Sequence, residues 1–539
     1  MSPQIPGSKK IIIIGAGVGG VALASRLSKA GHHVTVLEKN SFVGGRCSLI
    51  HHEGYRFDQG PSLWLMPKVF EEAFEDVGEN VYDHVELRKC DPNYIVHFHD
   101  GDRIRLSTDL IKLKDECERI EPGSFEGLLG FIQEGRTHYD LSVGAVLSRN
   151  FEKLTDLINP GNAHMALKLH VLTNCWGRIS KYFKSEKLRR AFTFQTMYMG
   201  MSPYDAPGTY NLLQYTELAE GIWYPIGGFN IFIQKLETIA KNFGATFLYD
   251  SPVSQINLDP TTNMATGVTL ENGTTMDADV VVCNADLVTA YNKLLPPTNY
   301  AKRLGKEPHT SSTFSFYWGM DRIVEGLDPH NVFLAGQDYR SSFDDIFKHG
   351  TLPEEPSFYL HVPSRVDPSA APAGKDSITI LVPVASMNHK SDASRDFDLL
   401  RQRARAAVIE VLERHLGIKD FEKMIVVEDV NGPPQWEKKF NLWGGSALGL
   451  SHNVMQVTYF RPSTRHSTYG NLFFVGASTH PGTGVPIVLK GAKIVADQIQ
   501  KCVDADNFKV SALPMDLPTL LVAVLAVVAA VVYASGFKF

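Results

Sequence analysis

The chain has 539 residues, more than one hydrophobic core usually serves, so the length predicts at least two lobes whose segments can interleave. Its formal net charge is only −6, and no run of five or more Lys and Arg occurs, which argues against nucleic acid as a partner. The six cysteines lie far apart and form no CxxC pair, so neither a redox dithiol nor a zinc knuckle is expected.

The first predicted element is a strand at residues 11–14, four consecutive isoleucines that suit a strand buried on both faces. Two preceding lysines imitate a secretory signal peptide, but the glycines that follow argue against that interpretation. Gly15, Gly17 and Gly20 come next, and apolar residues then continue at helical spacing. In such a turn the first glycine permits the tight bend, the second lets the backbone approach a pyrophosphate, and the third lets helix and strand pack closely. The pattern predicts dinucleotide binding.

Two further features indicate which dinucleotide is expected. A second predicted strand at residues 33–37 is followed by Glu38, at the distance where an acidic residue binds ribose hydroxyls, which favours FAD or NAD over NADP. Gly44, Gly45 and Arg46 resemble the second glycine-arginine element of the glutathione-reductase and amine-oxidase flavoproteins, where these residues surround one FAD. Arg46 can neutralise phosphate charge, and a surface arginine is the alternative. The resemblance implies FAD as cofactor, with NAD at most a secondary electron acceptor.

The middle of the chain predicts a β-meander. Residues 245–249 indicate a strand, and short strands follow between residues 253 and 276 around an Asn-Gly turn. Another strand is expected at residues 279–285. In the same superfamily such a meander returns the chain to the central sheet, so the resemblance implies an α/β fold: a discontinuous, Rossmann-like FAD-binding domain of the glutathione-reductase/amine-oxidase type with an inserted α+β substrate domain. The expected FAD-binding segments are residues 1–90, 221–300 and 441–505, and the expected substrate-domain segments are residues 91–220 and 301–440.

The strongest motif lies near the C-terminus. Residues 471–485, followed by Gly491, match the C-terminal signature of the bacterial- and fungal-type phytoene dehydrogenases, or phytoene desaturases, of the carotenoid/retinoid oxidoreductase family. The pattern predicts a strand at residues 472–477, a turn, and a helix at residues 485–500 whose amide-rich start can stabilise a reduced, anionic flavin. The resemblances together imply cofactor contacts at Gly15, Gly17, Gly20, Glu38, Gly45, Arg46, Gly60, Gly476, Gly482, Gly484 and Val485.

Two more segments, residues 56–62 and residues 221–228, resemble the same family. Trp64 interrupts the aliphatic run that the family commonly has after Gly-Pro-Ser, and it either reshapes a substrate tunnel or fills the core. In the second segment two aromatic residues offer flat apolar walls and two glycines allow close approach of flavin or substrate, although a packed core turn explains the aromatic residues nearly as well. These candidates for substrate binding are Trp223, Tyr224, Gly227 and Gly228.

The resemblance implies an oxidoreductase acting on CH–CH groups, an FAD-dependent desaturase that introduces successive double bonds into phytoene toward lycopene or 3,4-didehydrolycopene. Hydride would pass to the flavin with proton loss from the neighbouring carbon, in an apolar slot that excludes water. Glu217, Glu220 and His480 are the candidate catalytic bases, and a solvated carboxylate or a hydrogen-bonded histidine is the alternative for each. No metal-binding motif is recognised. The implied partners are a lipophilic C40 polyene, a membrane and an electron acceptor such as quinone or oxygen, with a homo-oligomer left open.

Two other functions stay open at this point. A flavoprotein of the same superfamily could act on another polyprenoid, as a carotenoid isomerase or retinol saturase does, or could oxidise an amine. A non-catalytic prenyl-binding escort, like the Rab GDP-dissociation inhibitors, shares the fold without catalysis. The intact glycine motif with Glu38 and Arg46 argues against an escort, because binding a prenyl chain needs no pyrophosphate site.

The last predicted element is a hydrophobic helix at residues 517–534, which carry no charge and are almost wholly aliphatic. As a helix they would span about 27 Å, close to the roughly 30 Å hydrocarbon core of a bilayer. The pattern predicts a single C-terminal anchor in the endoplasmic reticulum or another intracellular membrane, with the catalytic body on the cytosolic side. A segment that lies in one leaflet is the alternative.

Overall fold

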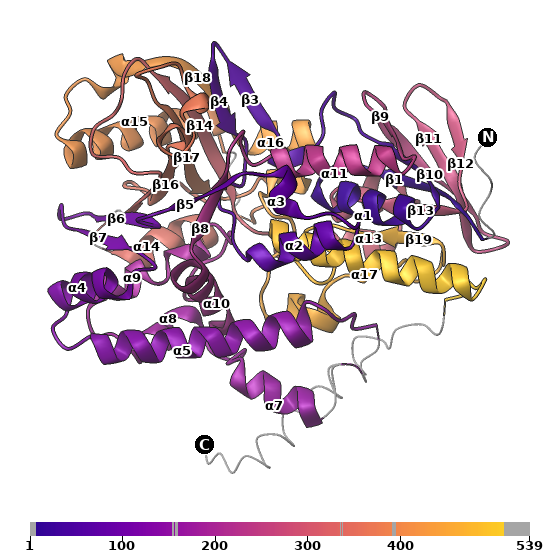
Figure 1. The fold of residues 1–539 in the computed structure, drawn as a ribbon, viewed down its shortest axis with the longest axis horizontal. Coiled ribbons are helices and arrows are strands. Elements are labelled where there is room, and N and C mark those ends of the chain that lie inside the picture. Colours follow the sequence, from indigo (N-terminus) through magenta and orange to yellow (C-terminus); the bar gives the residue numbers. More distant parts are fainter. Residues whose placement is uncertain are drawn as a thin grey trace.

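Two β-sheets organise the molecule, one toward each end of its long axis (Figure 1). The computed structural model describes residues 7–152, 156, 160–334, 336, 338–390 and 395–510. Separate hydrophobic clusters lie against the two sheets. A third and larger cluster contains residues of both sheets, so the division into two lobes stays a prediction from the chain length.

The first sheet is parallel, in the order β19-β13-β1-β2-β9. The four isoleucines of β1 divide between its faces: Ile11 and Ile13 join one core cluster, whereas Ile12 and Ile14 join another. A strand buried on both faces needs apolar side chains at every position, which explains the unbroken isoleucine run. The strands are β1 (Lys10–Ile14), β2 (His33–Leu37), β9 (Thr246–Leu248), β13 (Val280–Cys283) and β19 (Leu472–Phe474).

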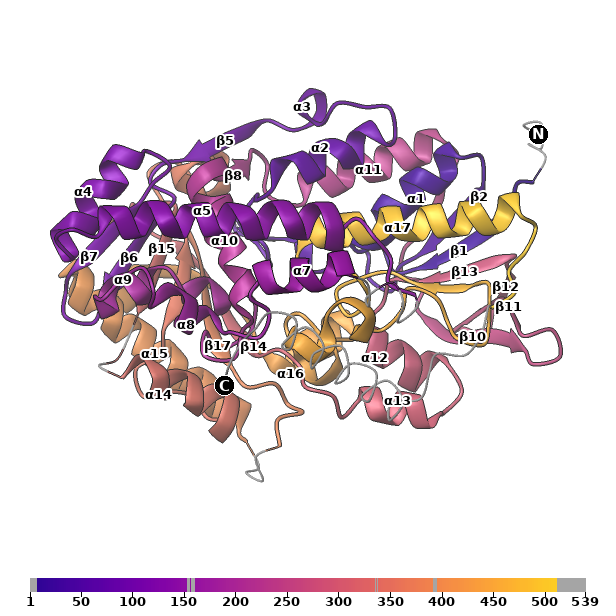
Figure 2. The ribbon, with the colours of Figure 1, turned by 90° about the horizontal axis from the view of Figure 1, so that it is seen from below.

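Helices cover one face of this sheet, and a β-meander covers the other (Figure 2). On the helical face α1 (Val18–Lys29) contacts both α11 (Ile231–Asn242) and α17 (Val485–Asp504). The meander shares a core cluster with the apolar residues of β1 that point toward it. Its antiparallel strands are β10 (Val253–Asp259), β11 (Met264–Leu270) and β12 (Thr275–Asp277).

The second sheet is mainly antiparallel and has the order β18-β14-β17-β16-β15-β6-β7, in which β15 and β6 pair in parallel. Residues of α15 (Phe397–Leu416) share a core cluster with β14 and β17, while residues of α5 (Phe125–Leu141) share the other large cluster with β6. The strands are β6 (Tyr94–Phe98), β7 (Arg103–Leu106), β14 (Ser312–Met320), β15 (His330–Leu334), β16 (Phe358–His361), β17 (Ser377–Val384) and β18 (Ile425–Asn431).

Shorter elements connect the two sheets. Two β-ribbons pair β3 with β4 and β5 with β8. Their bounds are β3 (Leu49–His52), β4 (Tyr55–Asp58), β5 (Leu87–Cys90) and β8 (Ile222–Pro225). The remaining α-helices are α2 (Pro67–Glu75), α3 (Val81–His84), α4 (Leu110–Ile120), α7 (Pro160–Lys168), α8 (Cys175–Ile179), α9 (Glu186–Ala191), α10 (Leu212–Tyr215), α12 (Leu287–Thr289), α13 (Asn299–Leu304), α14 (Tyr339–Asp344) and α16 (Pro433–Phe440).

The predicted α/β class and the discontinuous Rossmann-like domain are confirmed, because strands from three distant parts of the chain form one parallel sheet. Element boundaries differ by a few residues. The strand predicted at residues 472–477 ends at Phe474; Val475 still donates to the Cys283 carbonyl, and Gly476, at φ 142°, then turns the chain. The helix predicted to end at residue 500 continues to Asp504.

The prediction of a membrane-located protein held by a single C-terminal span is not supported. Across the residues that the structure describes, no helix is both long and apolar enough to cross a bilayer. The two longest, α15 and α17, have 20 residues each but carry several charged side chains. The predicted hydrophobic helix at residues 517–534 lies outside the described residues.

Candidate active site

A cavity of about 1090 Å³ extends from the first sheet to the second. Ile14, Leu37 and Cys283, at the carboxyl ends of parallel strands β1, β2 and β13, line one part of it. Tyr359 of β16 and Leu381 of β17 line another part. Ligands of open α/β sheets bind outside the carboxyl ends of the strands, so this cavity is the candidate active site.

The first glycine turn borders this cavity and has no room for side chains. Gly15 has φ 98°, a conformation that favours glycine, and a Cβ on Gly20 would lie 2.1 Å from the Gly15 carbonyl oxygen. A Cβ on Gly17 would lie 2.8 Å from the Asn284 side chain. Gly17 is also the N-cap of α1 and provides no side-chain cap, so the first N–H groups of the helix are left for an anion.

The carboxylate of Glu38 is held against the same turn at the end of β2. One of its oxygens accepts a hydrogen bond from the Ala16 amide at 2.8 Å, and the other accepts from the Asn40 amide at 2.9 Å. Glu38 is buried and lines the cavity. An immobilised carboxylate at this position fits a ligand that offers ribose hydroxyls.

Arg46 is a cation that lines the cavity, where the Asp286 carboxyl attracts it from beyond ion-pair distance. It follows Gly44 and Gly45, which both have positive φ, and its guanidinium donates to the Ala447 carbonyl. No ion pair joins Arg46 to any of the described acidic residues, and burial lowers the pKa of its guanidinium. A Cβ on Gly60 would lie 2.7 Å from the Arg46 carbonyl oxygen, which explains a glycine there. An unpaired cation beside a helix N-terminus fits a pyrophosphate.

The C-terminal turn lies beside the first one. A Cβ on Gly19 of α1 would lie 3.1 Å from the Val475 side chain, so the two βα turns are neighbours. Gly482 and Gly484 have φ of 148° and 95°, and α17 then begins at Val485 without a side-chain cap. The residues predicted to contact the cofactor line the one cavity except Gly20, which lies behind Gly15; those lining it are Gly15, Gly17, Glu38, Gly45, Arg46, Gly60, Gly476, Gly482, Gly484 and Val485.

Of the three candidate bases, Glu217 lies just behind the cavity wall. Its side chain is 1% exposed, and the neighbouring Thr216 lines the cavity. The carboxylate accepts hydrogen bonds from the Tyr198 hydroxyl at 2.5 Å and the Gln195 amide at 2.9 Å, and Tyr198 itself lines the cavity. Burial raises the pKa of Glu217 to about 7.

The other two candidates lie outside the cavity lining. Glu220 is partly exposed and accepts a hydrogen bond from the Tyr139 hydroxyl at 3.1 Å. The Nε2 of His480 lies 2.5 Å from the Arg149 carbonyl and its ring packs on Phe151. Burial lowers the pKa of His480 to about 4, so its neutral imidazole donates from Nε2.

The predicted substrate residues lie in strand β8, which holds Trp223 and Tyr224, and in the turn after it, which holds Gly227 and Gly228. The Tyr224 hydroxyl donates to Asp58 at 2.6 Å, and the Trp223 carbonyl accepts from the Trp64 amide at 3.0 Å. Trp64 is fully buried and stacks on Phe70 with ring centroids 3.8 Å apart, so it fills the core. None of the four described candidates for substrate binding, Trp223, Tyr224, Gly227 and Gly228, lines the cavity.

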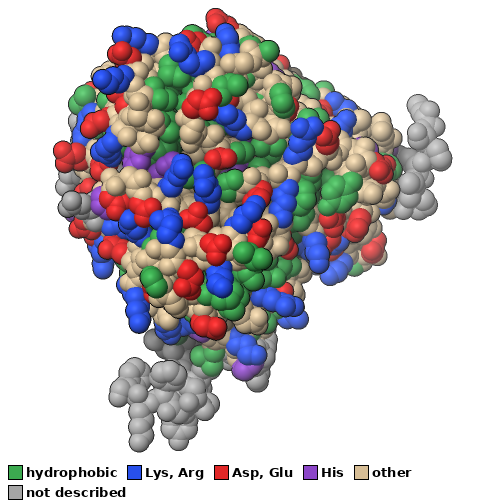
Figure 3. Space-filling view, turned by 60° about the vertical axis from the view of Figure 1, so that its left-hand side comes forward, with side chains coloured by type: hydrophobic (Ala, Val, Ile, Leu, Met, Phe, Trp, Pro, Cys, Tyr) green, Lys and Arg blue, Asp and Glu red, His purple; other side chains and the backbone are tan. Residues whose placement is uncertain are grey.

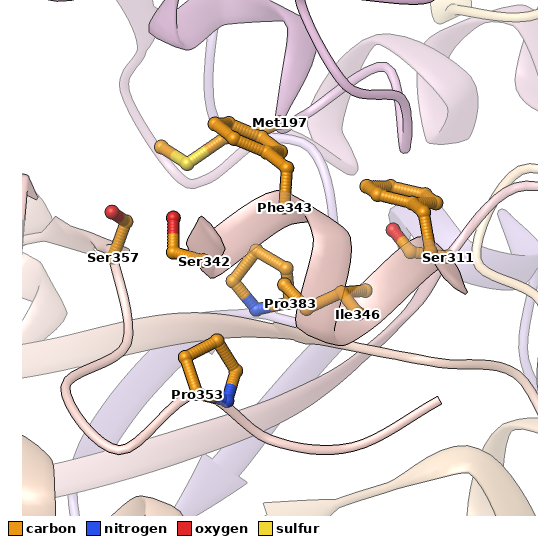
Figure 4. Close-up of a pocket in the computed structure, with 9 residues that line it drawn as sticks. Met197, Ser311, Ser342, Phe343, Ile346, Pro353, Ser357 and Pro383 are labelled. Atoms are coloured by element: carbon orange, nitrogen blue, oxygen red, sulfur yellow. The ribbon is translucent and has the colours of Figure 1, made fainter. Parts of the chain in front are cut away.

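The apolar part of the cavity comes from segments that carried no recognisable motif. A chamber of about 10 Å³ adjoins it and shares Met197, Ser311 and Pro383 with its wall; Figure 4 shows Met197 next to Phe343 there. Because the lining side chains are ordinary core-type residues, their spacing in the sequence does not distinguish a cavity wall from a core. They include Val146, Leu147, Leu169, Val171, Phe194, Met197, Met199, Leu212, Leu213, Leu381 and Val457.

The family model described as flavin containing amine oxidoreductase matches residues 18–500, which is most of the chain. The chain belongs to this family. A phytoene desaturase of Phycomyces blakesleeanus is 55% identical over 511 residues, covering 94% of this chain and 87% of that protein. A phytoene desaturase of Fusarium fujikuroi is 50% identical, covering 92% and 89%. A solved putrescine oxidase bound to putrescine has a TM-score of 0.59 at 15% identity, over 93% of this chain and 100% of that one, a likeness that shows the fold alone.

As a member of this family, the protein uses FAD, and the described residues fit that cofactor. The uncapped start of α1 and the unpaired Arg46 suit the pyrophosphate, and the immobilised Glu38 suits the ribose. A side chain at Gly17 would collide with Asn284, so only a glycine there lets the backbone lie close to the cofactor. These features are properties of this chain and do not depend on the name of the family.

Sequence reasoning missed Arg461, which holds the C-terminal turn before α17 in place. Its side chain is 3% exposed and donates to the carbonyls of Thr479, Ser451 and Gln456 at 3.1, 3.1 and 2.8 Å. Burial lowers the pKa of Arg461 to about 10. The contacts cross up to 18 residues, so no local pattern in the sequence reveals them.

We expect Arg461→Met to release flavin and destabilise the protein by about 3 kcal/mol, because several buried carbonyls lose their donor at once. Flavin absorbance per protein and urea unfolding measure both effects. Arg465→Met is the matched control: Arg465 donates to the carbonyls of Gly470 and Phe508, neither of which lines the cavity. If both variants retain flavin equally, Arg461 does not position the turn.

Proposed function

We propose that this chain is an FAD-dependent desaturase of phytoene that introduces successive double bonds toward lycopene or 3,4-didehydrolycopene. One observation carries the proposal: the glycine turns and Arg46 line the same continuous cavity as apolar side chains such as Leu213 and Leu381. A long hydrocarbon that reacts beside a flavin needs such a slot. Carotenoid isomerase, retinol saturase and non-catalytic escort functions are not favoured, because relatives matched over nearly the whole chain are named phytoene desaturases.

When bound, FAD supplies the acceptor for a hydride from the polyene. The protein's own residues position the reactants and exclude water. We propose that Glu38 binds the ribose, that Arg46 binds the pyrophosphate, and that the start of α17 faces the flavin ring. The apolar wall holds the polyene and keeps water away from the reacting carbons.

Among the candidate bases, Glu217 is the proposed proton acceptor, because Tyr198 connects it to the cavity at 2.5 Å. Glu220 and His480 have no comparable connection among the described contacts. Trp223, Tyr224, Gly227 and Gly228 are not proposed to contact the substrate directly; Trp223 pairs with Trp64, whose neighbours Leu63 and Leu65 line the cavity.

We propose that the segments of one sheet bind the cofactor and the segments of the other bind the substrate. The strands of the parallel sheet come from the segments proposed to bind FAD, and all seven strands of the second sheet come from the segments proposed to bind substrate. The FAD-binding segments are residues 1–90, 221–300 and 441–505, and the substrate segments are residues 91–220 and 301–440.

The proposed entrance for the polyene is formed by two surface segments beside the cavity wall. Leu169 and Val171 line the cavity, while the adjacent Leu172 is 73% exposed. Val454 lines it too, and Met455 next to it is 45% exposed. An apolar rim of this kind suits uptake of an insoluble hydrocarbon from a membrane surface. On the face seen in Figure 3, basic and acidic side chains are interspersed, with small apolar areas between them.

The purified protein should show a flavin spectrum and convert phytoene in liposomes to coloured products when quinone or oxygen is supplied as acceptor. Leu172→Asp with Met455→Asp should slow conversion roughly tenfold while leaving the flavin spectrum unchanged, because the rim no longer enters the lipid surface. Light scattering of the same preparation measures whether a homo-oligomer forms. Flavin-loaded protein that yields only colourless product with every acceptor contradicts the desaturase assignment but leaves the fold intact.

A further inference from the structure

Three tyrosines, Tyr198, Tyr210 and Tyr359, stand among the apolar residues that line the cavity, and the Tyr210 hydroxyl donates to the His452 carbonyl. Tyr359 lies 2.8 Å from the hydroxyl of Ser62, which also lines the cavity. Ser62 is two residues beyond Gly60, and Gly60 packs against Arg46. Tyr198, Tyr359 and Ser62 form a polar patch. This patch borders the part of the cavity assigned to the cofactor, where the reacting carbons of a substrate would lie.

Behind Tyr198, three donors converge on the buried Glu217. The hydroxyl groups of Tyr198 and Tyr94 donate to one carboxylate oxygen at 2.5 and 3.3 Å, and the Gln195 amide donates to the other at 2.9 Å. The Gln195 carbonyl accepts from Gln214 at 2.8 Å, which keeps the Gln195 amide nitrogen turned toward Glu217. Because all three groups donate, they favour the ionised form of the Glu217 carboxylate.

Glu217 has no cationic partner among the described residues. A buried carboxylate without a cation is costly, and a neutral glutamine would make similar packing contacts at lower cost. Such a group is therefore a candidate for proton transfer rather than for structure. The groups that face Glu217 from neighbouring elements are Tyr94 of β6, Tyr198, and Tyr359 of β16; His330 of β15 lies beside both Tyr94 and Tyr359.

We propose that Tyr198 is the group that takes the proton leaving the polyene, and that it passes its own hydroxyl proton to Glu217. This inference rests on the proposed function and adds a second residue to it. A C–H bond breaks on the carbon beside the one that gives up hydride, and its electron pair becomes the new double bond. The substrate proton goes to the Tyr198 oxygen and the Tyr198 proton goes to the Glu217 carboxylate, while bound FAD would supply the acceptor for the hydride.

Protonation of the neighbouring groups does not interfere near neutral pH. Burial holds the pKa of His330 well below its ordinary value and the pKa values of Tyr94, Tyr198 and Tyr359 well above theirs. Glu217 is therefore the group in this patch that changes charge near pH 7. Tyr198 both lines the cavity and donates to Glu217, which no other described donor to Glu217 does.

The test compares Tyr198→Phe with Tyr94→Phe in the flavin-loaded protein. Both changes remove a donor to Glu217, but only Tyr198 lines the cavity. We expect Tyr198→Phe to slow flavin reduction by phytoene at least about 100-fold with little change in KM, and Tyr94→Phe to slow it less than about fivefold. Flavin reduction at the wild-type rate and with the wild-type pH profile in Tyr198→Phe overturns the proposal.

A second measurement is independent of turnover. Infrared titration should reveal a buried carboxyl band that ionises near pH 7, is absent in Glu217→Gln and shifts in Tyr198→Phe because its strongest donor is lost. A band unaffected by Tyr198→Phe contradicts the relay, whatever the substrate. If the wild type binds FAD but does not desaturate phytoene, the proposed function fails, and the infrared result still decides whether Tyr198 and Glu217 are coupled.

Discussion

Gly20→Ala should yield a protein that no longer retains FAD. The new Cβ would lie 2.1 Å from the Gly15 carbonyl oxygen, which is backbone at the tight turn and cannot move alone. Strand β1 and helix α1 would have to separate, and the N–H groups at the start of α1 would leave the pyrophosphate. We expect affinity for FAD to fall at least about 100-fold, equivalent to roughly 3 kcal/mol. Titration of FAD into the flavin-free protein, followed by flavin fluorescence, measures the change in affinity.

Gly144→Ala is the matched control for this prediction. Gly144 lies in a helical turn at residues 142–146, and a Cβ there would meet no atom within 4 Å. The same chemical change is therefore expected to leave FAD affinity within about twofold. Equal retention of FAD by the two variants would mean that the first glycine turn does not contact the cofactor, and the proposed cofactor site would have to be abandoned.

Glu217→Gln should change how the stability of the protein depends on pH. Burial raises the pKa of Glu217 from 4.5 to about 7, so the folded state disfavours the charged form. The favourable contribution of Glu217 to the free energy of unfolding is fully present below the unfolded pKa of 4.5, and it is lost as the pH rises through about 7. Glutamine cannot ionise. Relative to the wild type, the free energy of unfolding of Glu217→Gln should increase by about 2 kcal/mol between pH 5.5 and pH 8.

Urea unfolding of the two proteins at both pH values checks this difference, because groups that titrate identically in the two proteins cancel. Glu220→Gln is a useful comparison: its carboxyl is half-buried, so the same measurement should show a smaller pH-dependent difference. A difference between wild type and Glu217→Gln that stays constant from pH 5.5 to 8 would show that Glu217 is already ionised or already paired with a cation in the folded protein.

Much of the cofactor part of the site could be predicted from local patterns. Residues 11–14, the glycine turn and Glu38 are close together in the sequence, and their spacing is nearly sufficient to define a strand, a turn and a helix start. The resemblance at residues 471–485 indicated the second turn. That these two turns meet, with Gly19 against Val475, follows from the parallel order of the sheet rather than from either motif.

The substrate part of the site was predicted less well. Trp223 and Tyr224 were chosen because aromatic residues suit a hydrocarbon, but they lie in strand β8, where backbone pairing with Trp64 and the hydrogen bond to Asp58 keep them out of the cavity lining. The same side-chain types serve cores and cavity walls, so composition cannot distinguish them. Tyr198 attracted no notice in the sequence because its partners, Glu217 and the cavity wall, come from elsewhere in the chain.

The amino-acid sequence by itself determined the nucleotide-binding chemistry of this protein, since backbone conformation at glycines and the charge of Glu38 and Arg46 are encoded within a few consecutive residues. Only the tertiary structure decided which apolar side chains line the cavity and which acid is connected to it. Burial, and the pKa of Glu217 with it, depends on strands and turns brought together across more than a hundred residues, and that proximity has no local signal.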